Sequence, residues 1–174
     1  ASAGPLDRWL KSLVADPGTT GETRLFLDLF AGVARVAKFM SSRRYKTCQI
    51  DIKHGPQHDI TDPYVLNRLI EAIFAGKFSS VMVACPCTSF SVARDRTCVI
   101  RTAREPWGVS DKTKFSTTDH DVLRSGNRIM RAVIRILNAL VQMQVPFILE
   151  NPRSSRLWHI PAIRRLLCNE YSYF

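Results

Sequence analysis

Two cysteines flank a proline at the end of an apolar run, and this is where the sequence could carry out covalent chemistry. The run from Ser80 to Ala84 ends in Cys85-Pro86-Cys87, a pattern typical of a buried parallel strand that brings a side chain to the carboxyl edge of a sheet. Because a thiolate is a good nucleophile, Cys87 is a candidate nucleophile. The alternative is an ordinary core residue, since free cysteine is among the most buried residue types.

Other uses of the cysteines are less favoured. Their number is odd and they are scattered along the chain, which does not fit a disulfide framework and indicates a reducing, intracellular setting. Cys85 and Cys87 could form half of a metal site, but no second pair at ligand spacing accompanies them, so no metal is expected. The five are Cys48, Cys85, Cys87, Cys98 and Cys168.

Carboxylates close two further strand-like stretches, at Asp51 and Glu150. Asp51 could accept hydrogen bonds from ribose hydroxyls, or it could be a solvated strand end. A carboxylate that closes an apolar strand is costly to bury unless it is paired, so Glu150 is expected to face a cleft. The alternative is a salt bridge from Glu150 to Arg153 or Arg156.

A glycine turn, Asp28-Leu29-Phe30-Ala31-Gly32, joins the first strand-like run to a helical stretch. Glycine allows the backbone to approach a ligand closely, and together with Asp51 it indicates an adenosine-containing cofactor. Neither G-x-G-x-x-G nor G-x-x-x-x-G-K is present, which disfavours a nicotinamide dinucleotide or a P-loop nucleotide. Asp59 either contacts the adenine amino group or caps the helix that begins near Asp62.

The elements that must position these residues alternate between strand and helix. This order predicts an α/β fold with a doubly wound, mostly parallel sheet, in one domain over residues 1–174. Because the carboxyl ends of parallel strands meet at one edge, the candidate groups should converge there. Strands are expected at Leu25–Phe30, Thr47–Asp51, Ser80–Ala84, Pro146–Glu150 and from Tyr171 onward, and helices at Pro5–Val14, Val33–Met40, Asp62–Gly76, Asn127–Met143 and Pro161–Leu167.

The charge balance suggests a partner. There are 25 lysines and arginines against 15 acidic residues, a net charge of +10, and this makes nucleic acid the first partner to consider. Many of these charges fall in an aperiodic basic loop at about 94–126, and a loop of that length is usually functional or disordered. No apolar run approaches the roughly 20 residues needed to span a bilayer, so no membrane partner is expected.

Three motifs in order resemble the DNA cytosine-5 methyltransferase family. They are Asp28-Leu29-Phe30-Ala31-Gly32, Pro86-Cys87-Thr88-Ser89-Phe90-Ser91 and Glu150-Asn151-Pro152. The resemblance spans about Leu25 to Asn151 and implies a Rossmann-like fold with S-adenosylmethionine as cofactor. Because the family's last strands and final cofactor-binding helix would lie beyond Phe174, the resemblance is to a divergent or truncated member. Another domain or subunit would then supply target recognition.

The resemblance also implies a role for individual residues. Cys87 would attack C6 of a flipped-out cytosine, and Glu150 would hold the pyrimidine edge at N3. The cofactor-binding residues would be Asp28, Phe30, Ala31, Gly32, Asp51, Asp59, Ile60 and Pro86. The nucleic-acid-binding residues would be Ser91, Arg94, Arg96, Arg101 and Asn151.

Two other functions stay open. One is a catalytically silent Rossmann-like module that binds nucleic acid or serves as a partner subunit. The other is a methyltransferase that acts on RNA, although that class places its nucleophile in a Thr-Cys on the next strand, where this chain has Glu150-Asn151. DNA is therefore the expected substrate, and the nucleus the expected location if the chain is eukaryotic.

Overall fold

The computed structural model describes residues 25–168, so the elements expected at Pro5–Val14 and from Tyr171 onward lie outside the described residues. The chain divides into two compact units, one with residues 25–84 and 135–150 and the other with residues 85–134 and 151–168. The strands are β1 Leu25–Leu29, β2 Thr47–Ile50, β3 Phe78–Val83 and β4 Phe147–Leu149. The α-helices are α2 Arg35–Ser42, α3 Pro63–Phe74, α4 Thr117–Gln142 and α5 Pro161–Leu167, and the 3-10 helices are η1 Ile52–His54, η2 Pro56–His58, η3 Val92–Arg96 and η4 Arg156–His159.

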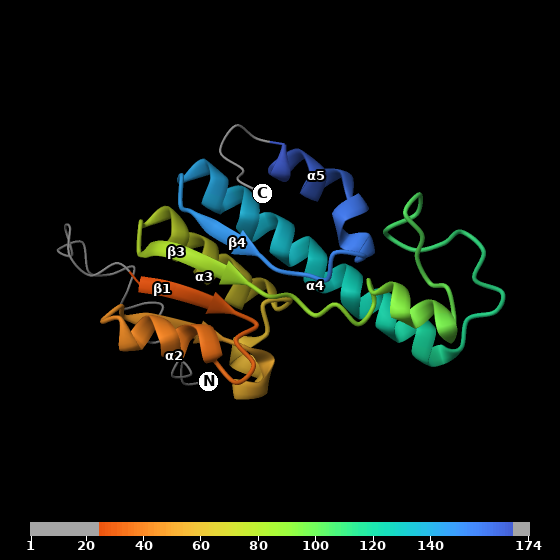
Figure 1. Ribbon diagram of the computed structural model, residues 1–174, viewed down its shortest axis with the longest axis horizontal. Helices are drawn as coiled ribbons and strands as arrows, with labels where there is room; N and C mark the ends of the chain where they lie inside the picture. The colour runs from red at the N-terminus through yellow and green to blue at the C-terminus, as the bar shows by residue number, and fades with distance from the viewer. Residues whose placement is uncertain (1–24, 169–174) are drawn as a thin grey trace. The chain divides into compact units, whose positions relative to one another are not determined.

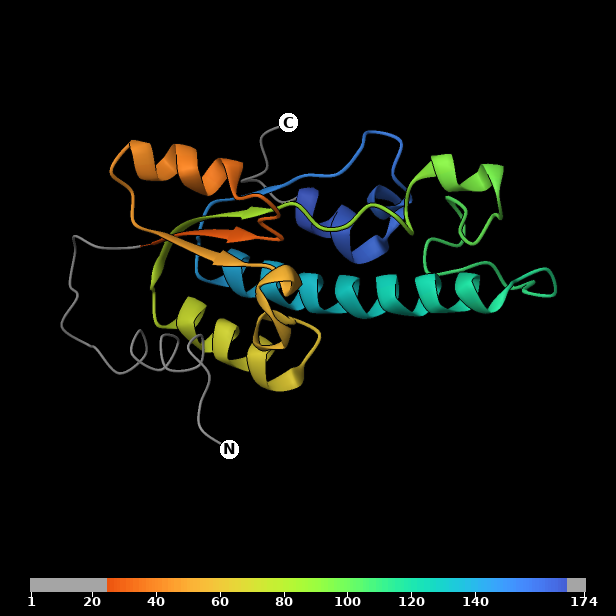
Figure 2. The same ribbon diagram turned by 90° about the horizontal axis from the view of Figure 1, so that it is seen from below.

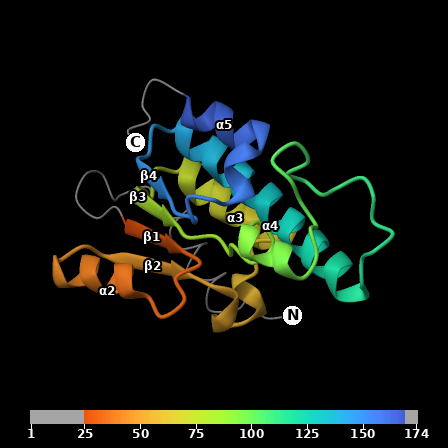
Figure 3. The ribbon, with the colours of Figure 1, turned by 45° about the vertical axis from the view of Figure 1, so that its right-hand side comes forward.

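The first unit is built on a four-stranded sheet in the order β2-β1-β3-β4 (Figure 3). All three strand pairs are parallel, which confirms the predicted α/β class and parallel sheet. β1 is central and buried along its whole length, as expected for a strand with neighbours on both sides. The chain moves from β1 to β2 on one side and then crosses to β3 on the other, so the topological switch point lies between β1 and β3.

Helices of the first unit cover the two faces of this sheet. β1, β3 and β4 run side by side in Figure 1, and the turned view places α2 on one side of the strands and α3 on the other (Figure 2). α3 buries an apolar face of Val65, Leu66, Leu69, Ala72 and Ile73. Helices on both faces of a parallel sheet are compatible with a Rossmann-like arrangement.

The start of α3 is fixed by Asp62, whose Oδ1 accepts hydrogen bonds from the N–H groups of Tyr64 and Val65. Because these donors have no partner within the helix, we expect Asp62→Ala to lower the free energy of unfolding by about 1 kcal/mol. Denaturant unfolding measures this loss, and Asp62→Asn, which retains a capping oxygen, serves as the control. Equal losses in the two variants would contradict the capping role.

α4 begins at Thr117, ten residues earlier than the start predicted near Asn127. The prediction was wrong because the first turns are polar and contain Gly126, which hides the apolar periodicity. A capping box fixes the start: Ser116 N–H donates to Asp119 Oδ2, and Asp119 N–H donates to Ser116 Oγ. The long basic loop is correspondingly shorter, because η3 occupies Val92–Arg96 and α4 takes the residues from Thr117 onward.

Within the described part of the chain, no helix combines the length and the apolar character needed to cross a membrane.

Candidate functional site

The turn after β1 has an unusual backbone. Phe30, Gly32 and Ala34 have φ values of 62°, 57° and 57°, and the left-handed region is unfavourable for the two residues with side chains. Phe30 N–H donates to Ile50 O at 2.8 Å, which ties the turn to the end of β2. A Cβ atom added at Gly32 would meet no atom within 4 Å apart from those of its two chain neighbours. The turn therefore borders open space at the sheet's switch point, where α/β proteins bind ligands.

Asp51, at the end of β2, lies directly against this turn. Its Oδ2 accepts the N–H of Gly32 at 2.8 Å and its Oδ1 accepts the N–H of Lys53 at 2.9 Å. Burial raises the pKa of Asp51, but the hydrogen bonds from Lys53 and Gly32 and the nearby positive charges outweigh this, and the pKa lies below its ordinary value. Asp51 is thus an ionised carboxylate, and each oxygen keeps a lone pair that can accept a hydrogen bond from a hydroxyl group.

Two predicted cofactor residues are buried beneath the site. Asp28 is 3% exposed, and its Oδ2 accepts the N–H of Ala37 in α2 at 3.1 Å. Burial raises the pKa of Asp28, the Ala37 hydrogen bond partly offsets this, and the charge of Asp51 adds to the rise. Ile60 is 4% exposed. Asp28 and Ile60 are more deeply buried than Asp51, which is 8% exposed, so we assign these two residues to the support of the turn and of the loop after β2.

Asp59 lies in the loop after β2 and forms hydrogen bonds within that loop. Its Oδ1 accepts from both the N–H and the hydroxyl of Thr61 at 2.8 Å. The alternative in which Asp59 caps α3 is wrong, because Asp62 does so.

Sequence reasoning missed Ile52, which is 56% exposed immediately after Asp51. An aliphatic residue next to an acidic strand end was the available signal, since such a side chain can pack on a base.

Cys87 lies in the second unit, in a turn that follows β3 in the chain. The N–H groups of Phe90 and Ser91 both donate to Cys87 O, at 2.9 and 2.8 Å. Cys87 is half-buried, whereas Cys85 is 3% exposed, which supports Cys87 as the accessible thiol of the pair. Pro86 is exposed.

Asn151 and Ser91 both have local partners in the second unit. Asn151 Nδ2 donates to Cys85 O at 2.9 Å, so this amide holds the Cys85-Pro86-Cys87 turn. Asn151 Oδ1 is buried and has no hydrogen-bond partner among residues 25–168. Ser91 Oγ accepts the N–H of Ala93 and caps η3.

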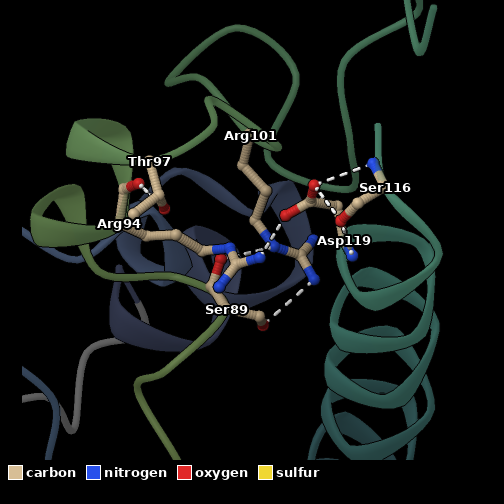
Figure 4. Close-up of polar contacts among 6 residues, drawn as sticks. All are labelled: Ser89, Arg94, Thr97, Arg101, Ser116 and Asp119. Atoms are coloured by element: carbon tan, nitrogen blue, oxygen red, sulfur yellow. Dashed lines mark hydrogen bonds and ion pairs between the residues drawn. The ribbon is translucent and has the colours of Figure 1, made fainter. Parts of the chain in front are cut away.

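Two of the three arginines predicted to bind phosphate point inward (Figure 4). Arg94 forms an ion pair with Asp119, and Arg101 is 1% exposed with its donors directed at protein acceptors. A phosphate-binding role for Arg94 and Arg101 does not fit this placement, because their guanidinium groups are already engaged inside the unit. Arg96 is exposed, and its role in nucleic-acid binding stays a prediction.

Glu150 is exposed at the end of β4 in the first unit, and its N–H donates to Val83 O at 2.9 Å. One of its expected partners, Arg156, forms an ion pair with Asp95. The first unit therefore brings Gly32, Asp51 and Glu150 to the carboxyl edge of one sheet.

The chain matches no protein-family model, and comparisons with curated proteins and with solved structures find no match.

Proposed function

We propose that this chain is an S-adenosylmethionine-dependent methyltransferase that methylates C5 of cytosine in DNA. The observation that carries the proposal is the ionised Asp51 carboxylate, hydrogen-bonded to the N–H of Gly32 beside open space at the switch point. A carboxylate in this position fits the ribose hydroxyls of an adenosine cofactor. Ile52 would pack against the adenine, and Phe30 and Ala31 would line the methionine end.

The bound cofactor would supply a methyl group on a sulfonium. The chain's own task is to make cytosine C5 nucleophilic: the Cys87 thiolate adds to C6, and the electron pair of the C5–C6 bond moves toward C5. Glu150 would hydrogen-bond the pyrimidine at N3 and stabilise the charge that develops there. After methylation, loss of the C5 proton to a base would restore the double bond and release the thiol.

A DNA partner is supported by the charge of the chain and by one helix. The net charge is +10, and α4 exposes Arg124, Arg128 and Arg131 at a spacing that places them on one side of the helix. Arg131 also lies over the ring of Trp107, at 5.6 Å from its centroid. These three residues, the α4 arginines, could contact successive phosphates. They would take the phosphate-binding role that the sequence predicted for Arg94 and Arg101.

Neutralising the α4 arginines should weaken DNA binding regardless of sequence. We expect Arg124→Gln and Arg128→Gln each to lower the slope of log affinity against log salt by about 1, because each removes one phosphate contact. Fluorescence anisotropy with labelled duplex DNA at several salt concentrations measures this. Arg35→Gln, an exposed arginine of α2, is the control, and a slope lowered equally in all three variants would contradict a specific role for α4.

The proposed reaction is tested by incubating the chain with methyl-labelled cofactor and mixed DNA and RNA, followed by mass spectrometry of the nucleosides. We expect labelled 5-methylcytosine from DNA. Label only in RNA would support the RNA methyltransferase instead. Absence of any transfer would overturn the proposed activity, and absence of S-adenosylhomocysteine binding in calorimetry would then favour the catalytically silent module.

A further inference from the structure

Arg101 is a buried arginine in the second unit whose hydrogen-bond partners are all neutral. It is 1% exposed, and its guanidinium donates to Ser89 O at 2.9 Å, Pro106 O at 2.7 Å and Asn127 Oδ1 at 2.8 Å, with longer bonds to Ser89 Oγ and Leu123 O at 3.2 and 3.3 Å. Burial lowers the pKa of Arg101 to about 10, which leaves it protonated at neutral pH. Because desolvating a charge is costly, a site of this kind needs its full set of hydrogen bonds.

The contacts of Arg101 converge on the turn that contains Cys87. Ser89 accepts two of its hydrogen bonds, and the guanidinium lies over the ring of Phe90 at 3.9 Å from the centroid. Ser89 and Phe90 are the middle of the turn that the N–H groups of Phe90 and Ser91 close on Cys87 O. Arg101 thus contacts both central residues of a turn whose first residue is the candidate nucleophile.

The guanidinium of Arg101 also donates hydrogen bonds to a regular element. Leu123 O and Asn127 Oδ1 belong to α4, and Asn127 Nδ2 in turn donates to Trp107 O at 2.8 Å. A Cβ atom at Gly126 would lie 2.0 Å from Ser89 Oγ and 2.9 Å from Arg101 Nη2. A side chain at position 126 would therefore displace Ser89 or Arg101 where α4 packs against the turn. Arg101 links that turn to a helix held by its own backbone hydrogen bonds.

We propose that Arg101 is a positioning residue for Cys87, a role that rests on the proposed function of Cys87 as nucleophile. Arg101 does not touch the reacting atoms. It fixes the Cys87–Ser91 turn against α4, so that the thiol has one orientation when a cytosine is bound. Small errors in the placement of a reacting group can cost about 100-fold in rate, which sets the scale of the expected effect.

The test compares Arg101→Met with Arg101→Lys, and uses Arg104→Met, an exposed arginine of the same loop, as the matched control. We expect Arg101→Met to lower kcat by about 100-fold while KM for DNA changes less than about threefold, because alignment is lost and binding is retained. Arg101→Lys should recover part of the loss, since it retains the charge and part of the hydrogen bonding. Wild-type kcat in Arg101→Met, or an equal loss in Arg104→Met, would overturn the proposal.

A second measurement separates this proposal from the proposed function. Hydrogen exchange of the peptide that spans residues 87–91 should be faster in Arg101→Met, while peptides from β1 and β3 exchange as in the wild type. If the wild type transfers no methyl group, the proposed function fails, and unchanged exchange in this peptide overturns the positioning role independently. If Arg101→Met does not fold, Ser89→Ala, which removes only the hydroxyl partner, decides: unchanged kcat and exchange then overturn the proposal.

Discussion

Cys87→Ser is expected to abolish methyl transfer to DNA while S-adenosylhomocysteine still binds. A serine hydroxyl is not ionised near neutral pH and is a far weaker nucleophile than a thiolate, so addition to cytosine C6 should fail. Loss of a catalytic nucleophile costs about 10⁴-fold or more in kcat in enzymes that form covalent intermediates. The hydrogen bonds that hold the Asp51 carboxylate come from the N–H groups of Gly32 and Lys53 and do not involve the Cys87 side chain, so cofactor affinity should be retained.

Two measurements check this expectation, transfer of labelled methyl groups and trapping with an oligonucleotide that contains 5-fluorocytosine. Fluorine at C5 prevents loss of a proton, so the wild type should remain covalently attached to the oligonucleotide and Cys87→Ser should not. Cys98→Ser, which removes another half-buried thiol of the same unit, should behave as the wild type. Methyl transfer that persists in Cys87→Ser, or trapping that disappears in Cys98→Ser, contradicts the assignment of the nucleophile.

The elements that were predicted correctly are those whose signals lie within one short stretch of the sequence. The helix at Pro161–Leu167 matches α5, because a proline at the first position and an apolar repeat are both visible in one short stretch. The strand ends at β1 and β3 were also predicted within about two residues, since buried parallel strands read as continuous apolar runs. Sequence reasoning failed where α4 begins, because there a capping box and not apolar spacing defines the helix.

The roles of the arginines could not be predicted in the same way. A basic composition gives the number of charges but not the side of the fold on which each one lies. The acceptors of Arg101 come from positions 89, 106, 123 and 127, and no local pattern links those segments. The left-handed conformation was foreseeable at Gly32 but not at Phe30 and Ala34, which adopt it against their own preference.

Asp51→Asn is expected to weaken S-adenosylhomocysteine binding by about 10- to 100-fold. The substitution removes the negative charge, and because the amide nitrogen of asparagine only donates, one of the two N–H groups of Gly32 and Lys53 loses its acceptor. Loss of a hydrogen bond to a charged group costs about 1.5 to 3 kcal/mol, which corresponds to this range of affinity. Isothermal titration calorimetry measures the change directly.

The control for Asp51→Asn is Asp62→Asn, which removes the same charge from the same unit but retains the cap of α3. Its affinity should stay within about threefold of the wild type, because exposed charges are screened by salt. An equal loss in both variants would mean that net charge, and not the Asp51 carboxylate, governs binding. Unchanged affinity in Asp51→Asn, in a variant that thermal unfolding shows to be folded, would contradict the proposed cofactor site. The Asp51–Gly32 hydrogen bond would then serve only to hold the strained turn in place.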